Sequence, residues 1–339
     1  MISSKLACGL AAIGILAGCS SVPTYTFPPR DGDCVDLSGA PCAGAMTPDQ
    51  LTHEVPETFP DTTYTYVVSL IGLPEATSDP DMDGPLRAAA AGFDVDGLDS
   101  YPPSDAPDAN CEEFIEDFVA LTDPNHVGVD NALQGLVGTI EGFLEPMDCP
   151  GMMTDGCLDA TLQRQIEEGS LLLIMEVSGV NDFSYDSAVT LQLHLAETTD
   201  MMPPMVSGGG GLAGGQTFNS TMVLGDPVAG DIFAGRLRAS TPLLPLVIDT
   251  GGFMLTLMIT QAQVRFNITA TTLDRGAIGG VVTVEAIVEA ASVIAPGMEM
   301  LVRQVVETIA DVDPSAADPA VCTAMSLGLT FSGVEATVN

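Results

Sequence analysis

The sequence predicts a mainly β protein, an antiparallel β-sandwich of jelly-roll type with several short helices packed at its ends. The clearest evidence is an alternation in which Val189, Leu191, Leu193 and Leu195 are separated by more polar residues, because successive side chains of a strand point to opposite faces. Strand-like segments separated by short polar turns follow one another from residue 170 onward, as they do in sandwiches. A hydrophobic content of 46% in 339 residues is ample to bury a core.

Individual strands are predicted where β-branched and aromatic residues cluster between turn-forming residues, beginning with residues 64–73. Further strands are predicted at residues 171–177, 189–196, 232–239, 244–248, 253–259, 261–271 and 326–338. Helices are predicted where apolar residues recur at helical spacing, at residues 112–121, 131–144 (with Asp130 as its N-cap), 158–168, 283–295 and 299–312.

The N-terminal residues have the features of an export signal. Lys5 precedes an apolar run from residue 6 to residue 16, and small residues then lead to a cysteine in the order Leu16-Ala17-Gly18-Cys19. This order resembles the lipobox of bacterial lipoproteins, and the resemblance implies cleavage before Cys19, a thioether-linked diacylglycerol on its side chain, and a fatty acid such as palmitate. The alternative is an ordinary cleaved signal in which Cys19 is incidental. The apolar run is too short for a transmembrane helix, which needs about 20 residues.

Three segments are therefore expected along the chain. Residues 1–18 form a lipoprotein signal peptide, residues 19–60 a Pro/Asp-rich tether, and residues 61–339 a β-rich globular domain with an acidic loop region at residues 77–130. Ser20 and Ser21 stand where some lipoproteins carry an aspartate that retains them at the inner membrane. By resemblance to that sorting rule, the predicted location is the cell envelope, with a lipid anchor in the outer membrane.

Acidic residues dominate the charge, and the formal net charge is -37. Lys5 is the only lysine, so without the signal peptide eight arginines oppose 46 acidic residues. Nucleic acid is excluded as a partner, because binding it requires clustered cations. Self-repulsion of this size destabilises a compact state, and either a saline habitat or bound divalent cations would offset it.

The cysteines indicate disulfides rather than a metal site. Outside Cys8 and Cys19 six cysteines remain, an even number in a chain with an export signal. The candidate pairs are Cys34 with Cys42, Cys149 with Cys157 and, by elimination, Cys111 with Cys322. A zinc site is the alternative, but the sequence contains no C-x-x-C and no histidine at ligand spacing from a cysteine.

Two acidic motifs are candidate calcium sites, because alternate carboxylates ahead of a glycine can wrap hard oxygen ligands around one ion. Residues 78–84 contain D-x-D-x-D-G, although Ala90 stands where an EF-hand has its closing glutamate, and residues 93–99 contain D-x-D-G-x-D. The alternative is a solvated acidic loop without an ion. The candidate ligands are Asp79, Asp81, Asp83, Asp94, Asp96 and Asp99.

Two resemblances extend beyond the lipobox. The aspartate-rich strings resemble the calcium-binding loops of thrombospondin type 3 repeats. The lipobox, the segment Gly92-Phe93-Asp94-Val95-Asp96-Gly97, Cys111 and the segment Gly128-Val129-Asp130-Asn131 together resemble uncharacterised Asp-rich secreted lipoproteins of myxobacteria and their relatives. The second resemblance implies export and anchoring but brings no known activity.

The sequence predicts a structural or binding role rather than catalysis. No G-x-S-x-G, H-E-x-x-H or S-x-x-K motif follows the signal peptide, and only His53, His126 and His194 are present. A carbohydrate-binding or carbohydrate-active sandwich is the alternative, although the chain lacks tryptophan. Expected partners are the membrane, through the lipid anchor, and an envelope protein or glycan. The segment 201–205, Met-Met-Pro-Pro-Met, is predicted as a loop with core-filling ends, with a copper site as the alternative.

Overall fold

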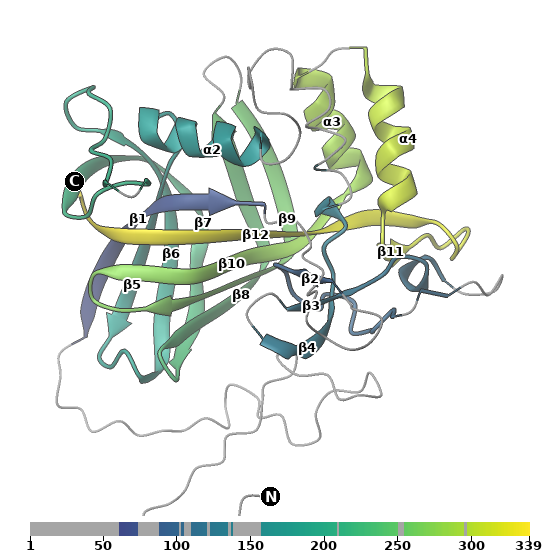
Figure 1. Cartoon of the computed structure of the whole chain (residues 1–339), viewed down its shortest axis with the longest axis horizontal. Coiled ribbons are helices and arrows are strands. Elements are labelled where there is room, and N and C mark those ends of the chain that lie inside the picture. The colour runs from purple at the N-terminus through teal and green to yellow at the C-terminus, as the bar shows by residue number, and fades with distance from the viewer. Residues whose placement is uncertain are drawn as a thin grey trace, which may run out of the picture.

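The centre of the molecule is a closed barrel of eight antiparallel strands (Figure 1). The computed structural model describes residues 61–73, 88–101, 103–104, 110–120, 123–134, 137, 157–208, 210–249, 254–294 and 297–339. The barrel strands, in their order around the barrel, are β1 (Thr62–Gly72), β5 (Leu172–Val180), β6 (Tyr185–Thr198), β7 (Gln216–Phe233), β8 (Arg236–Asp249), β9 (Met254–Ile268), β10 (Thr272–Thr283) and β12 (Cys322–Val338).

The predicted jelly-roll sandwich is wrong because the last strand closes the sheet on itself. One edge of β12 pairs with β10, and its other edge pairs with β1 at Val67↔Val334 and Ile71↔Phe331. A sandwich and a barrel both give strands one buried and one exposed face, so their sequences alternate alike. Only the closing pair distinguishes the two architectures.

The barrel interior is packed with apolar side chains. Tyr66, Leu237 and Phe266 are completely buried, and the ring of Phe266 meets that of Phe331 edge to face with centroids 5.7 Å apart. The polar end of Tyr66 is satisfied, since its hydroxyl donates to the Thr269 carbonyl oxygen at 2.6 Å. The alternation predicted on residues 189–196 is confirmed, since Val189, Leu191 and Leu193 are all buried on β6.

Two further strand predictions need correction. The segment predicted as one strand at 232–239 is the end of β7 and the start of β8, joined by a turn at Ala234 and Gly235 with positive φ at both residues. The strands predicted at 253–259 and 261–271 form one strand, β9, with a register irregularity near Gln261, which also has positive φ. Positive φ marks both a turn and a bulge, which a single sequence does not distinguish.

The helices lie outside the barrel, and three of the predictions are confirmed: α2 (Cys157–Glu168), α3 (Val284–Ile294) and α4 (Glu299–Ile309). Helix α2 lies against β1, where the Asp159 carboxylate accepts the Leu73 N–H at 2.7 Å. The helix predicted at 112–121 is wrong, because a short 3₁₀ turn, η2 (Cys111–Glu113), and strand β3 (Phe118–Ala120) occupy it. The helix predicted at 131–144 lies mostly outside the described residues. None of the described helices combines the length and the apolar character needed to span a bilayer.

A second, smaller unit packs on the outer face of β10 and β12; we call its residues 88–134 the acidic lobe. It contains a three-stranded sheet of β2 (Ala89–Ala90), β3 and β4 (Asp123–Val129). Two barrel glycines allow its close approach: a Cβ at Gly279 would lie 2.7 Å from the Phe93 ring, and a Cβ at Gly328 would overlap the Ala91 carbonyl oxygen. The short strand β11 (Val312–Pro314) pairs with the start of β12 beside the lobe.

Filling the space between the barrel and the acidic lobe should weaken their contact. We expect Gly328→Ala to lower the free energy of unfolding by about 1–3 kcal/mol, the usual effect of overpacking a tight site. Gly208→Ala is the control, because a Cβ there meets nothing within 4 Å; it should change stability by less than about 0.5 kcal/mol. Urea unfolding of both variants measures the difference, and equal stabilities would contradict the close approach.

Candidate metal site

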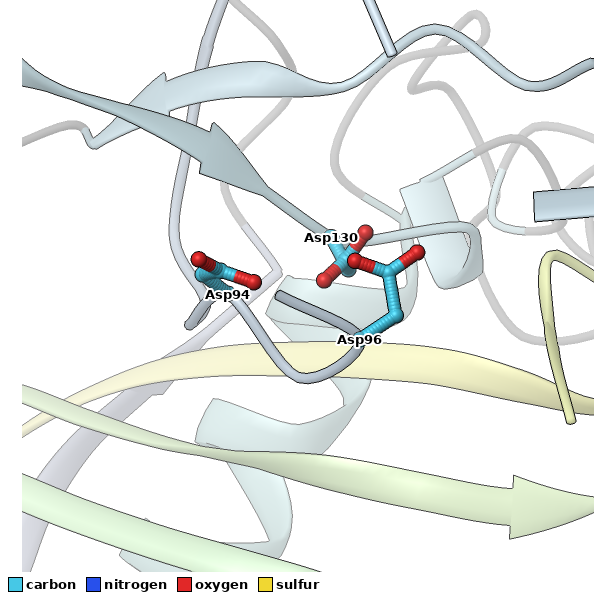
Figure 2. Close-up of side chains that lie close together, drawn as sticks. All are labelled: Asp94, Asp96 and Asp130. Carbon is cyan, nitrogen blue, oxygen red and sulfur yellow. The ribbon is translucent and has the colours of Figure 1, made fainter. Parts of the chain in front are cut away.

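Three carboxylates of the acidic lobe converge on one point (Figure 2). One oxygen from each of Asp94, Asp96 and Asp130 lies within 4.8 Å of the other two. Asp94 and Asp96 lie on a turn that follows Phe93, and Asp130 comes directly after β4. A bridge between Phe93 and Asp130 joins the two segments, with the Asp130 N–H donating to the Phe93 carbonyl oxygen at 3.1 Å.

Local hydrogen bonds hold the turn in place. The Asp94 carboxylate accepts the Gly97 N–H at 2.7 Å, and the Asp96 carboxylate accepts the Leu98 N–H at 2.8 Å. These are the side-chain-to-backbone bonds that make aspartate a turn former. Gly97 has a φ of 81°, which favours glycine. The D-x-D-G pattern therefore builds the turn and also presents its two carboxylates on it.

The third carboxylate is fixed by the barrel. Next to Asp130, the Asn131 side chain donates to the carbonyl oxygens of Ala91 (2.6 Å) and Gly328 (3.3 Å) and accepts the Gly328 N–H (3.2 Å). Asp130 itself accepts the Val95 N–H at 2.7 Å. Strand β12 thus positions Asp130 against the aspartate turn through a buried amide.

The carboxylates lie in an environment that disfavours their charge. Asp130 is only 2% exposed, and one oxygen of Asp96 is buried without a hydrogen-bond partner. Burial raises the pKa of Asp94 to about 7, with further contributions from Asp96 and Asp99. Burial, followed by the charges of Asp96 and Asp117, raises the pKa of Asp130 well above its usual value. A cation at the point of convergence would remove this cost.

A neighbouring buried carboxylate supports the same region. Asp311 accepts the N–H of Ser326 at 2.8 Å and also its hydroxyl, and the Ser326 hydroxyl oxygen accepts the Ala132 N–H at 2.8 Å. Burial raises the pKa of Asp311 to about 6. Together with the bonds from Asn131 to Gly328, this chain of bonds ties residues 131 and 132 to β12 at two points, directly beside Asp130.

The geometry suits a hard divalent cation. Calcium takes six to eight oxygen ligands at 2.3–2.6 Å, so two oxygens bound to one ion lie at most about 5 Å apart. The 4.8 Å limit of the three carboxylate oxygens satisfies this condition. Three carboxylates leave room for backbone oxygens and water, which is the usual composition of such a shell.

The six predicted ligands have different outcomes. Asp94 and Asp96 lie in the cluster. Asp99 does not belong to the triad, although its charge contributes to the raised pKa of Asp94. Asp130 is not among the six predicted ligands, because an aspartate ahead of an apolar helical pattern predicts the N-cap of a helix. Its position in Gly128-Val129-Asp130-Asn131, after a strand, was the available signal. The remaining candidates, Asp79, Asp81 and Asp83, lie outside the described residues.

One of the three predicted disulfides is confirmed, the pair that was assigned by elimination. Cys111 and Cys322 form a disulfide with Cα atoms 5.4 Å apart, joining η2 of the acidic lobe to the first residue of β12. Cys19, Cys34, Cys42 and Cys149 lie outside the described residues, and Cys157 begins α2. The disulfide therefore fixes the lobe covalently to β12, the same strand that positions Asp130.

Comparison with protein families, with characterised proteins and with solved structures finds no match to this chain. The residues of the described chain bring together three acidic ligands, and His194 lies elsewhere, on β6, with its Nδ1 3.1 Å from the Ser220 hydroxyl oxygen of β7.

The raised pKa values predict an unusual pH dependence in the absence of divalent cations. A carboxyl group whose pKa is raised in the folded state contributes stability below its unfolded pKa of about 4 and loses it as the pH rises through the folded value. For Asp94 and Asp311 the loss extends to pH values of about 7 and 6. We therefore expect the free energy of unfolding, measured in urea with a chelator, to fall from pH 5 to pH 8.

Repulsion among the many other acids also increases with pH, so the variant Asp94→Asn isolates the contribution of the site. Its stability should fall less steeply than that of the natural chain over the same range at fixed ionic strength. Parallel curves for the two proteins would show that Asp94 does not titrate in this interval.

Proposed function

We propose that this chain is a lipid-anchored protein of the cell envelope with a structural or binding role, and that a calcium ion stabilises its fold. The observation that carries the calcium proposal is the convergence of Asp94, Asp96 and Asp130, one carboxylate oxygen each within 4.8 Å. Two of these residues come from one turn and the third from the end of a strand, so one ion would cross-link them.

The position of the cluster favours a structural ion over a catalytic one. The carboxylates lie within the acidic lobe, and Asp130 is next to Asn131, whose side chain is hydrogen-bonded to Gly328 of β12. Extracellular modules bind calcium with dissociation constants of about 10⁻⁴–10⁻³ M. At a calcium concentration about one hundred times the dissociation constant, binding stabilises a protein by about 2.7 kcal/mol. This is large against a typical stability of about 5–15 kcal/mol.

The lipid anchor is proposed from the order Leu16-Ala17-Gly18-Cys19. The disulfide between Cys111 and Cys322 supports the same placement, because such bonds persist in oxidising compartments outside the cytosol. A net charge of -37 is compatible with a compact domain where salt or bound cations reduce the repulsion.

The carbohydrate alternative depends on a sandwich architecture, and the chain forms a closed barrel instead. Sugar-binding surfaces commonly use aromatic platforms, and the chain has no tryptophan.

Calcium should raise the melting temperature at fixed ionic strength. We expect an increase corresponding to about 1.4–2.7 kcal/mol at 10 mM calcium, reversed by a chelator and monitored by circular dichroism. Asp96→Asn should remove most of the increase, whereas Asp226→Asn, which deletes one charge from an exposed position of β7, should retain it. An unchanged melting temperature in calcium would refute the proposal that a bound calcium ion stabilises the fold.

Asp130→Asn should have effects of opposite sign with and without calcium. The asparagine can still accept the Val95 N–H, but it removes a buried charge. Without calcium at pH 8 the variant should therefore be more stable than the natural chain, and with calcium it should be less stable. Differential scanning calorimetry in both conditions provides the test. Shifts of the same sign in both conditions would argue against a site at Asp130.

Processing at Cys19 is tested independently of calcium. Intact-mass analysis of protein purified from the membranes of a bacterial host should show loss of residues 1–18 and addition of a diacylglycerol with fatty acid. Cys19→Ser should abolish the added mass. A natural chain that is cleaved without any lipid would disprove the anchor and leave the calcium proposal untouched.

A further inference from the structure

The connection between β6 and β7 presents an unusual apolar surface. We call residues 201–213 the methionine loop. The side chain of Met201 is 96% exposed, those of Met202 and Met205 are each 63% exposed, and Val206 is 46% exposed. These values correct the prediction that the methionines fill the core. Single exposed apolar residues are common on protein surfaces, but four within six consecutive positions form a group that calls for an explanation.

The methionine loop is held firmly in this exposed arrangement. The side chain of Gln216 accepts the Met205 N–H at 2.6 Å and donates to the carbonyl oxygens of Met205 (3.0 Å) and Ala213 (2.7 Å). Val206 and Leu212 form a β-bridge, and Leu212 is buried. These bonds fix the backbone at Met205, Val206 and Leu212, so the exposed arrangement of Met205 and Val206 is built into the loop.

The loop is also anchored to the barrel beside another exposed apolar residue. The Leu212 N–H donates to the Ser69 hydroxyl oxygen of β1 at 2.8 Å. A Cβ at Gly211 would lie 3.0 Å from Cδ2 of Leu70, which is 44% exposed. Leu70 therefore places one more exposed apolar side chain on the barrel wall, next to the loop at Gly211.

Charge is absent from this part of the sequence. Residues 201–225 contain no Asp, Glu, Lys or Arg, in a chain with 46 acidic residues. In Figure 1 the β6–β7 connection and the acidic lobe, which carries β2, β3 and β4, lie on opposite sides of the barrel. The methionine loop thus carries no charge of its own, although two carboxylates flank it: Asp200 accepts the Met202 N–H at 3.0 Å and Glu167 accepts the Gly211 N–H at 3.4 Å.

We propose that the methionine loop inserts into the interface of a lipid bilayer and that it orients the domain on the membrane. The proposal rests on the proposed lipid anchor at Cys19. Residues 20–61 separate that cysteine from β1, and even fully extended they span no more than about 150 Å. The bilayer is therefore an apolar phase permanently within reach of the loop, at a high effective concentration.

The charge distribution favours this orientation over any other. An anionic lipid surface repels the acidic lobe, with its many aspartates and glutamates, more strongly than the methionine loop, where Asp200 and Glu167 are the flanking acids. Interfacial binding scales with the apolar area that enters the membrane, and three methionines with Val206 and Leu70 supply that area. In this orientation the acidic lobe faces away from the lipid, open to calcium and to partners.

The absence of tryptophan makes the proposal directly measurable, because one introduced tryptophan is the only one in the chain. We compare Met201→Trp, Met205→Trp and Phe114→Trp in the lipidated full chain, reconstituted in phosphatidylcholine vesicles with brominated acyl chains. Phe114 is the control, since it is 37% exposed but belongs to the acidic lobe. Both loop reporters should show blue-shifted emission that the bromines quench, and the Phe114 reporter should show neither.

A charge introduced into the loop should reverse the effect. Adding Met201→Asp to the Met205→Trp chain should lower the ratio of inserted to exposed reporter roughly tenfold, because a buried methionine is replaced by a charge. Loop reporters that emit and quench like the Phe114 reporter would overturn the insertion, even if the mass confirms the lipid. If intact mass shows no lipid but the loop reporters are still blue-shifted and quenched, the anchor is refuted and the affinity of the loop for the bilayer stands.

Discussion

The close contact between the acidic lobe and the outer face of β10 and β12 is the constraint on which the rest of the structure depends. It exists because Gly279 and Gly328 present no side chain where the lobe approaches. The pairing of β1 with β12 ends at Thr330, so β1 does not reach Gly328. The buried side-chain amide of Asn131 instead bonds the N–H and the carbonyl oxygen of Gly328. A buried amide with all its bonds made specifies one arrangement, because any shift leaves polar groups unpaired.

This contact also explains why carboxylates are brought together against their mutual repulsion. Apolar packing, backbone hydrogen bonds and the disulfide from Cys111 to Cys322 position the acidic lobe, and the aspartates are carried to the interface with it. Burial raises the pKa of Asp94, Asp130 and Asp311 as a consequence. The same fold leaves the uncharged methionine loop on the opposite side of the barrel, so the distribution of charge and apolar surface follows from the architecture.

Part of the site was predictable from local sequence and part was not. The pattern around Asp94 and Asp96 encodes both the turn and its ligands, because side-chain bonds to nearby N–H groups form it. Asp130 lies more than 30 residues further along, and an aspartate before an apolar helical pattern has the same signature as a helix cap. The pairing of Cys111 with Cys322 followed from counting, since the other cysteines fall into pairs close in sequence.

The sequence by itself determined the strands with regular alternation, helices α2, α3 and α4, and the aspartate turn, because each depends on residues a few positions apart. It did not reveal β10, whose glycines at 276, 279 and 280 weaken any strand signal and are explained only by the side chains and backbone that approach them. Barrel closure was decided by tertiary structure alone. Alternation reports that one face is buried, whereas closure depends on whether β12 finds β1, a pairing between residues such as Val67 and Val334 that no local pattern encodes.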